Sequence, residues 1–520
     1  YPLGAIGRDF FYQFYNGFLL SFILFTKSLT PPQFAAASII IIAIRAFDAL
    51  SAPIMGGIVE NTISKFGRFK PWILLGALLS GAVLIAIFTT PLKGWSFVAF
   101  FAGMFLLLNL TYTMNDIAYW SMLPSLSKNE FDRGRLTSFA QLCGGLGSGA
   151  CCIAVPLFTV GKFTLGGSAV SAYNVIAVAA AFMMSATQLI TFFGVKEPEN
   201  YIRRGEKLTL KAMFKTIAKN DQLLWAAAVL LLFNVGAGVV GGGQSLTYIY
   251  FEFGYNGILN TAFGVCFAIS MIIFTVLFPK LCKKFGRDNL VKFTCFCLIL
   301  GYTLMLAFGL LLPSDMKTVK FIAITVCNGI VGLGHGFFMI MSIYLAGAIE
   351  YNEWRYGTRG EGLIFSFKPL TSKLGSALIQ LIVMFVYLIV GVTSFTESIS
   401  NLENLAAMGA IDGAEKLIRI ENIIQSVPRG KITLLLILMC ALPIAFSLSA
   451  LIIYRKKCVI GDEEYRKILC DINLGVSPAA LGIKEGDKIK KALRCETKEL
   501  LRDSAEASPL ILDEFEELAV

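Results

Sequence analysis

Histidine is almost absent from this 520-residue sequence, in which His335 stands alone. The 12 cysteines are scattered without a Cys-x-x-Cys pair, so neither disulfides nor a metal site is indicated. Charged residues make up only 15% of the chain against 56% hydrophobic residues, a balance that lies outside the range of soluble globular proteins. We find no nucleophile–base pair and no cluster of metal ligands. These absences argue against an enzyme.

Long apolar segments dominate the sequence instead. A membrane-spanning helix needs about 20 mostly apolar residues, and twelve segments reach this length. Their continuous hydrophobicity differs from the alternating segments of about 10 residues that build transmembrane barrels. The sequence therefore predicts an all-α membrane protein with twelve transmembrane helices. Their centres are expected near residues 18, 46, 81, 107, 147, 181, 235, 270, 300, 330, 379 and 443.

Basic residues concentrate in the loops after the second, fourth, sixth and eighth segments. Because Lys and Arg favour cytoplasmic loops, both termini are expected in the cytoplasm. The same bias accounts for the net charge of +10, so no nucleic-acid partner is needed. The chain opens close to its first segment, and no separate signal peptide is expected. We expect a monomer in a bacterial plasma membrane, with membrane lipid and a small molecule as its partners.

The apolar segments divide into two sets of six around a polar stretch. The same tetrapeptide, Lys-Phe-Gly-Arg, occurs at 65–68 after the second segment and at 284–287 after the eighth. A match at corresponding places suggests parallel repeats. The tail contains no histidine, so it cannot be a histidine-phosphorylated regulatory domain. The predicted parts are an N-terminal six-helix bundle (1–195), a cytoplasmic central loop (196–220), a C-terminal six-helix bundle (221–455) and a cytoplasmic tail (456–520).

Three charged residues, Asp48, Asp116 and Lys373, lie inside apolar segments. A charge near the bilayer centre costs at least about 2.5–3.5 kcal/mol, so such residues usually face a bundle interior or a wet cavity and mark a substrate or ion pathway. Asp48 shares a helix face with Arg45 and could form a structural ion pair with it. Alternatively, Asp48 binds a cation or a proton, since an arriving cation offsets the cost of a buried carboxylate. Lys373 needs an acid from another helix, and Asp48 and Asp116 are equally suitable.

Tyr112, Asp116 and Trp120 are spaced four residues apart, so they share one helix face. A carboxylate accepts hydrogen bonds from two hydroxyl groups, and an aromatic plane stacks on the apolar face of a pyranose ring. This combination suits a polyhydroxylated substrate. A polar contact between helices with aromatic packing would explain the same residues. Asp9, which follows Arg8 at the start of the first segment, could equally be a charge at the cytoplasmic interface.

Several short blocks follow one another in a fixed order along residues 1–455, at 7–10, 45–48, 53–56, 66–72, 112–120, 350–354, 360–362 and 373–377. In this order they resemble the glycoside–pentoside–hexuronide cation symporters, the family that includes melibiose permease. The resemblance implies a major facilitator fold, in which two six-helix bundles surround a central cavity. It assigns sugar contact to Arg8, Asp9, Tyr112, Asp116 and Trp120, cation coupling to Asp48 with Ser51 and Thr113 nearby, and a position beside both sites to Lys373.

The sequence departs from the family pattern at three positions. Ala52 stands where many members carry a second acid, Ala140 where a sugar-contacting arginine is familiar, and Lys368 where melibiose permease has an uncharged polar residue. With one carboxylate fewer and one cation more, Asp48 suits a proton better than sodium, although a sodium ion there is possible. No cofactor other than this coupling ion is expected.

We therefore expect a secondary active transporter that imports a glycoside or a related sugar by alternating access, coupled to a cation, with a proton favoured over sodium. Two other functions fit the same sequence. One is a carrier of lysolipids or other amphipaths on the same fold. The other is a sugar sensor that does not transport.

Overall fold

The computed structural model describes residues 1–474 except 61, 63, 127–129, 197–219, 314, 357–360 and 459. All regular secondary structure in this part of the chain is helical. Eleven stretches of the described residues are long and apolar enough to cross a membrane. The expected first segment is not among these eleven, because it is broken at Phe18 into two shorter helices. The prediction of an all-α membrane protein is confirmed.

The first group of helices packs around α1. This helix contacts α6 and α7, while α4 contacts α5 and α7, and α3 contacts α5. Short helical turns, η1 (Gly161–Phe163) and η2 (Leu165–Gly167), join α6 to α7. The helices of this group are α1 (Gly4–Gly17), α2 (Leu19–Thr26), α3 (Pro31–Glu60), α4 (Lys70–Thr89), α5 (Gly94–Leu126), α6 (Glu130–Thr159) and α7 (Ala169–Gly194).

The second group contains the remaining crossing helices. Here α9 packs against α15 and α18, and α12 against α13 and α18. The two groups meet where α3 contacts α15 and α6 contacts α11. The helices of this group are α9 (Asp221–Val239), α10 (Ser245–Phe253), α11 (Gly257–Phe285), α12 (Arg287–Leu311), α13 (Lys317–Gly334), α14 (Gly336–Tyr356), α15 (Glu361–Val390) and α18 (Arg429–Lys457).

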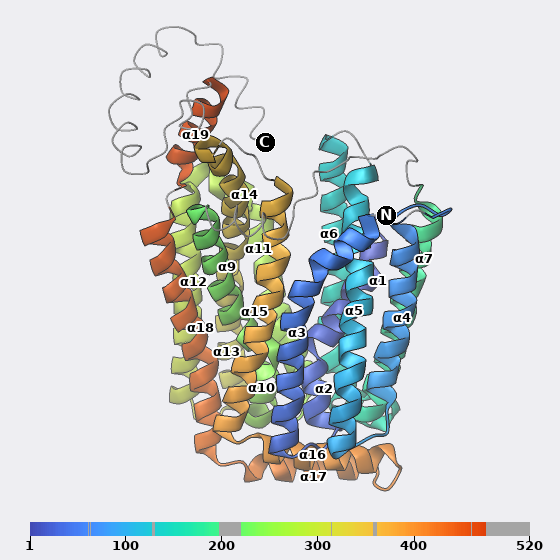
Figure 1. Cartoon of the computed structure of the whole chain (residues 1–520). Coiled ribbons are helices and arrows are strands. Elements are labelled where there is room, and N and C mark those ends of the chain that lie inside the picture. The colour runs from blue at the N-terminus through green and yellow to red at the C-terminus, as the bar shows by residue number, and fades with distance from the viewer. Residues whose placement is uncertain are drawn as a thin grey trace.

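The two ends of the molecule differ (Figure 1). The N-terminus and α19 (Asp462–Leu474) lie at one end, which we call the terminal side. At the opposite end, α16 (Thr393–Ala407) and α17 (Gly413–Ser426) run across both groups. We call these two helices the strap, and their end of the molecule the strap side.

Two of the predicted parts of the chain fall largely outside the described residues. The central loop was expected at 196–220, of which 197–219 are not described, and the tail is described only as far as residue 474. The division into domains therefore stays a prediction. The described beginning of the tail includes α19, which packs on α14, where the Trp354 indole N–H donates to Asp471 at 2.9 Å.

The first crossing segment of each group is interrupted. In the first group the interruption is at Phe18, between α1 and α2. In the second, a π-helical turn, η3 (Val240–Gln244), separates α9 from α10. Gly243 has a φ of +120° there, a conformation that glycine adopts without steric cost. A Cβ at Gly243 would lie 3.1 Å from the Tyr387 hydroxyl and 3.8 Å from Ser21 Oγ, so the two interruptions are neighbours.

Candidate functional site

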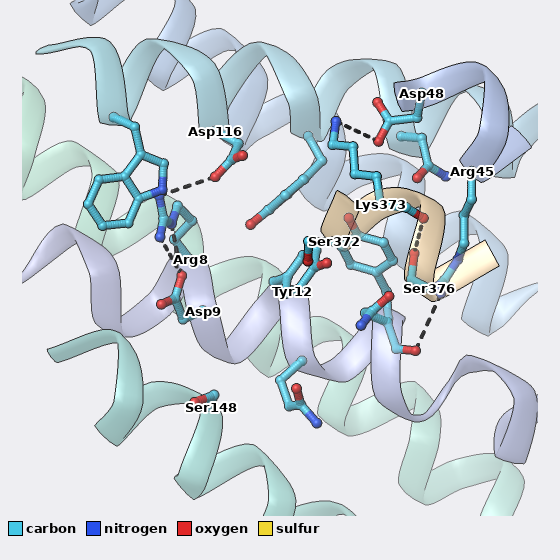
Figure 2. A pocket seen from close by; sticks show the side chains of 16 residues that line it. Arg8, Asp9, Tyr12, Arg45, Asp48, Asp116, Ser148, Ser372, Lys373 and Ser376 are labelled. Atoms are coloured by element: carbon cyan, nitrogen blue, oxygen red, sulfur yellow. Dashed lines mark hydrogen bonds and ion pairs between the residues drawn. The ribbon is translucent and has the colours of Figure 1, made fainter. Parts of the chain in front are cut away.

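A cavity of about 410 Å³ lies between the first group of helices and α15 (Figure 2). Each of its 16 lining side chains carries at least one polar atom. Such a wall is unexpected at the centre of a membrane protein unless it contacts water or a polar ligand. The lining residues are Arg8, Asp9, Tyr12, Gln13, Tyr15, Asn16, Arg45, Asp48, Asn109, Tyr112, Asp116, Trp120, Ser148, Ser372, Lys373 and Ser376.

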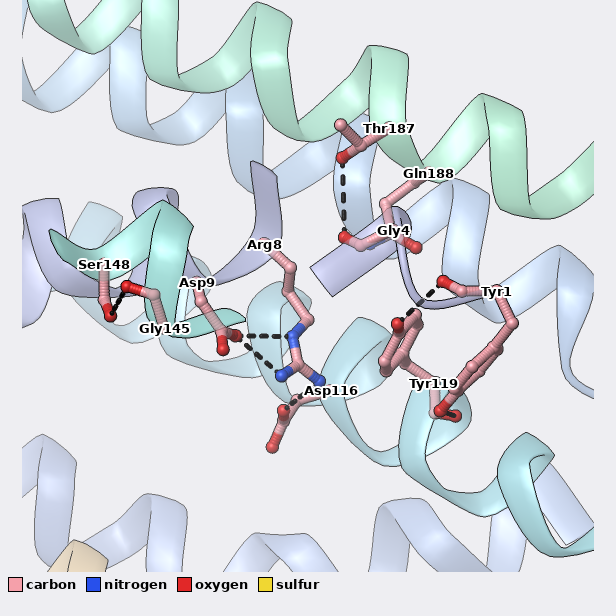
Figure 3. Close-up of polar contacts among 10 residues, drawn as sticks. All are labelled: Tyr1, Gly4, Arg8, Asp9, Asp116, Tyr119, Gly145, Ser148, Thr187 and Gln188. Atoms are coloured by element: carbon pink, nitrogen blue, oxygen red, sulfur yellow. Dashed lines mark hydrogen bonds and ion pairs between the residues drawn. The ribbon is translucent and has the colours of Figure 1, made fainter. Parts of the chain in front are cut away.

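Arg8 organises one end of the cavity (Figure 3). Its Nε and Nη2 donate to Asp9 Oδ1 at 2.9 and 2.6 Å, and its Nη1 donates to Asp116 Oδ1 at 3.3 Å. The guanidinium is buried, whereas the two carboxylates are 28% and 32% exposed. Among the described residues, Asp116 Oδ2 has no hydrogen-bond partner. Asp116 can therefore accept a hydrogen bond from a ligand while Arg8 neutralises its charge.

Aromatic rings fix the position of this arginine. The Arg8 guanidinium carbon lies 4.5 Å from the ring centre of Tyr119 and 4.7 Å from that of Trp120, within the range of cation–π attraction. Tyr112, on the same face of α5 as Trp120, stacks with Tyr12 of α1 at a centroid distance of 5.4 Å. The cavity thus has aromatic walls beside its carboxylates.

The close approach of α1 and α6 depends on glycine. A Cβ on Gly144 would collide with Asp9 Oδ2, and a Cβ on Gly147 would collide with the Ile6 carbonyl oxygen. Small residues allow membrane helices to pack closely, and here they also make room for the Asp9 carboxylate. The glycine-rich stretch of α6 therefore positions Asp9.

An ion pair at the other end of the cavity connects the two groups of helices. Lys373 Nζ of α15 lies 2.8 Å from Asp48 Oδ2 of α3. The Thr113 hydroxyl donates to Asp48 Oδ1 at 2.6 Å, and Lys373 Nζ lies 3.4 Å from the same hydroxyl oxygen. Of the two acids that the sequence allowed as partners of Lys373, the one that pairs with it is Asp48. Lys373 and Thr113 thus contact one carboxylate oxygen of Asp48 each.

Arg45 does not form the structural ion pair considered from the sequence. Its Nη2 donates to the Asn16 carbonyl oxygen at 3.4 Å, and the described ion pair of Asp48 is with Lys373. Arg45 is 5% exposed and lines the cavity. Asp48 thus pairs with Lys373, a cation of the second group of helices.

Most of the predicted site residues lie together. Seven of them line the cavity, namely Arg8, Asp9, Asp48, Tyr112, Asp116, Trp120 and Lys373. Thr113 contacts Asp48, whereas the Ser51 hydroxyl donates to the Asp48 backbone carbonyl at 3.1 Å and does not line the cavity. Ala140 is buried and outside the lining. The side chains of Ala52 and Lys368 lie outside the described part of the structure.

Eight polar residues of the wall were not identified from the sequence. On α1, Tyr12, Gln13 and Asn16 continue the face that begins with Arg8 and Asp9, at helical spacings of three and four residues. The same spacing rule applied to every polar residue of a crossing segment would have found them. The other polar residues of this set are Tyr15, Asn109, Ser148, Ser372 and Ser376. Within the described residues, no three His, Cys, Asp or Glu side chains could together hold a metal ion.

Residues 1–456 match the protein-family model described as MFS/sugar transport protein. The chain belongs to this family. The resemblance inferred from the sequence blocks is thereby confirmed, and with it the major facilitator fold. Together with its crossing helices, this membership makes it an integral membrane protein.

Individual relatives are more distant. The chain is 28% identical to the lactose permease of Lactobacillus helveticus, over 75% of this chain and 62% of that protein. It is 26% identical to the raffinose carrier protein of Pediococcus pentosaceus, over 91% of this chain and 70% of that one. The chain thus spans less than two thirds of the length of that lactose permease.

A solved structure shares the fold. It is that of a bacterial homologue of the human lysosomal transporter Spinster in an inward-facing and unoccupied conformation. The TM-score is 0.61 at 12% sequence identity, over 91% of this chain and 98% of the other.

Proposed function

We propose that this protein is a secondary transporter that carries a glycoside or a related sugar by alternating access. The observation that carries the proposal is the cavity wall, in which every lining side chain has a polar atom. Its volume of about 410 Å³ suits a small molecule, since ligand sites commonly measure about 300–1,000 Å³. The lactose and raffinose carriers among the relatives support a sugar as that molecule.

In this proposal Asp116 accepts hydrogen bonds from sugar hydroxyls, with Arg8 holding its other oxygen. Trp120 presents its ring to the apolar face of the sugar. The amides of Gln13 and Asn16 can both donate and accept, which suits adjacent hydroxyl groups. A lipid carrier would need apolar side chains around an acyl chain, and no lining residue is aliphatic. The lysolipid alternative therefore loses support.

The pair between Asp48 and Lys373 suggests how a cation couples to transport. We propose that the arriving cation competes with Lys373 for Asp48. A proton would neutralise the carboxylate and release Lys373, so the contact between the two groups of helices would weaken. A proton is favoured over sodium because Ala52 supplies no second carboxylate. One charge moving down 100 mV supplies about 2.3 kcal/mol, enough for roughly 50-fold accumulation at about 1.4 kcal/mol per tenfold ratio.

The remaining parts of the proposal concern location. A monomer in a bacterial plasma membrane, with both termini in the cytoplasm, fits the distribution of Lys and Arg among the loops. In that orientation the strap lies outside the cell. The coupling ion, H⁺ or Na⁺, is then the only ligand besides the sugar.

Uptake of labelled lactose and raffinose into proteoliposomes, under an imposed proton or sodium gradient, tests the function. We expect accumulation that is driven by the proton gradient. Equilibration that ignores both gradients would leave a facilitator without coupling. A sugar sensor would bind the sugar without moving it, whether or not residues 458–520 are present.

A further inference from the structure

Gln244, at the end of η3, carries a buried side-chain amide that stabilises no contact by hydrogen bonding within the described residues. It is 0% exposed, and neither its side-chain nitrogen nor its side-chain oxygen has a hydrogen-bond partner among the described residues. Gln222 of α9 shows the usual arrangement: it is 3% exposed, donates to the Lys457 carbonyl oxygen at 3.2 Å and accepts from the Tyr344 hydroxyl at 2.9 Å. Buried polar groups are nearly always paired, so the isolated amide of Gln244 requires an explanation.

The position of Gln244 in the fold suggests that explanation. It follows Gly243 in a π-helical turn, and such turns inside α-helices frequently occur at functional sites. The same turn interrupts the first crossing segment of the second group, as Phe18 interrupts that of the first. Interrupted segments at corresponding places in two halves point to the binding site of a transporter.

Gln244 lies just beyond the strap-side end of the cavity. Its neighbour Gly243 is close to Ser21, and Ser21 follows Asn16, the last lining residue of α1, by five positions. At 1.5 Å per residue along a helix this is about 7–8 Å. The turn that carries Gln244 therefore lies about one to two helical turns beyond the last lining residue of α1.

Several contacts join α2 to α10 and to the strap, on the strap side of Gln244. Phe25 of α2 packs against Tyr250 of α10 at a centroid distance of 5.7 Å. Beyond them, Ser400 Oγ of the strap accepts from the Ser28 backbone N–H at 2.8 Å, and the Asn404 amide donates to the Thr26 carbonyl oxygen at 2.8 Å. Opening the strap side requires that these contacts separate.

We propose that Gln244 binds the sugar only when the strap side is open. It joins the cavity when α10 moves away from α2 about Gly243. Its amide then donates to and accepts from sugar hydroxyls. In the arrangement described above, the same amide is buried without partners among the described residues, and this raises the free energy of that arrangement. Sugar arriving from the strap side thus meets a residue that sugar arriving from the terminal side does not. This inference rests on the proposed function.

Gln244→Met, which keeps the length of the side chain and removes its hydrogen bonds, tests the inference. Labelled lactose and raffinose are offered to the full chain from each side of sealed vesicles of known orientation, and the thermal unfolding of the sugar-free protein is followed. We expect the half-saturation concentration from the strap side to rise at least tenfold and that from the terminal side to change less than twofold. The melting temperature should stay the same or rise. Gln222→Met, the matched control, should lower the melting temperature and leave both half-saturation concentrations unchanged.

Three outcomes would overturn the inference. A lower melting temperature of Gln244→Met with unchanged half-saturation on both sides would make the glutamine a structural residue. An equal rise of the half-saturation concentration on both sides would show that the role of Gln244 does not depend on which side is open. Transport of neither sugar by the wild-type protein would end the proposed function as well. The first two outcomes leave that function standing, because the wild-type protein then transports.

Discussion

The two groups of helices contribute unequally to the cavity. Thirteen of the 16 lining residues come from α1, α3, α5 and α6, and the remaining three, Ser372, Lys373 and Ser376, all come from α15. The first group thus supplies all three acids and the aromatic rings. The second group supplies one cation, Lys373, and two serine hydroxyls. The first group therefore forms most of the cavity wall, and the second group adds one face of α15.

The ion pairs of these two regions differ in their access to water. In the cavity, the side chains of Lys373 and Asp48 are 21% and 11% exposed. In the strap, those of Lys416 and Glu403 are 2% and 0% exposed, at 3.0 Å from each other. Burial raises the pKa of Glu403, although Lys416 and the Ala169 N–H oppose the rise. A partly exposed pair is accessible to an ion from the solvent, whereas a fully buried pair is not.

The largest effect is expected in the strap. Glu403→Gln leaves the Lys416 ammonium buried without a counter-charge, which should lower the free energy of unfolding by about 3–5 kcal/mol. Thermal or denaturant unfolding of the detergent-solubilised protein measures the change. Glu415→Gln, which breaks the exposed pair with Arg419, is the control and should cost less than about 1 kcal/mol. Equal stability of the two variants would contradict the distinction between buried and exposed ion pairs.

The next effect concerns binding by the first group. Asp116→Asn replaces a charged acceptor, and hydrogen bonds to charged groups are worth about 1.5–3 kcal/mol, so sugar affinity should fall about 10–100-fold. Equilibrium binding of labelled sugar measures it. Asp412→Asn is the matched control, because Asp412 caps α17 far from the cavity and Asn caps a helix equally well. Undiminished binding by Asp116→Asn would remove this residue from the sugar site.

A third effect separates coupling from binding. Asp48→Asn cannot exchange Lys373 for a cation, so the gradient-driven accumulation of roughly 50-fold that one charge allows should fall to equilibration. Exchange of labelled for unlabelled sugar across the membrane should continue. The two assays on the same proteoliposomes distinguish these outcomes. Retained accumulation would place the coupling site elsewhere.

The smallest effect tests how the fold positions Asp9. Gly144→Ala places a methyl group on Asp9 Oδ2, whereas a Cβ on the adjacent Gly145 meets nothing within 4 Å. We expect the first substitution to weaken sugar binding about tenfold, or about 1.4 kcal/mol. Gly145→Ala should leave binding unchanged and stabilise the helix by up to about 1 kcal/mol. Identical binding by both variants would show that the carboxylate tolerates displacement.

The sequence was sufficient to predict how residues of the same helix are placed relative to one another. Tyr112, Asp116 and Trp120 share a face because helical periodicity is local, and Asp48 and Lys373 stand out because charge is costly in lipid. The sequence could not choose between Asp48 and Asp116 as the partner of Lys373, because either acid satisfies the charge. Only the packing of α3 against α15 decides between them.

Composition and periodicity alone therefore determined that the chain crosses a membrane and which of its residues are too polar to face lipid. The tertiary structure decided which of these residues meet, and it left Arg45 beside a backbone carbonyl and Gln244 without a hydrogen-bond partner in the described part of the chain. The physical reason is that helix formation and hydrophobicity depend on neighbours along the chain. Distances between helices depend instead on how small residues such as Gly144 allow the helices to pack.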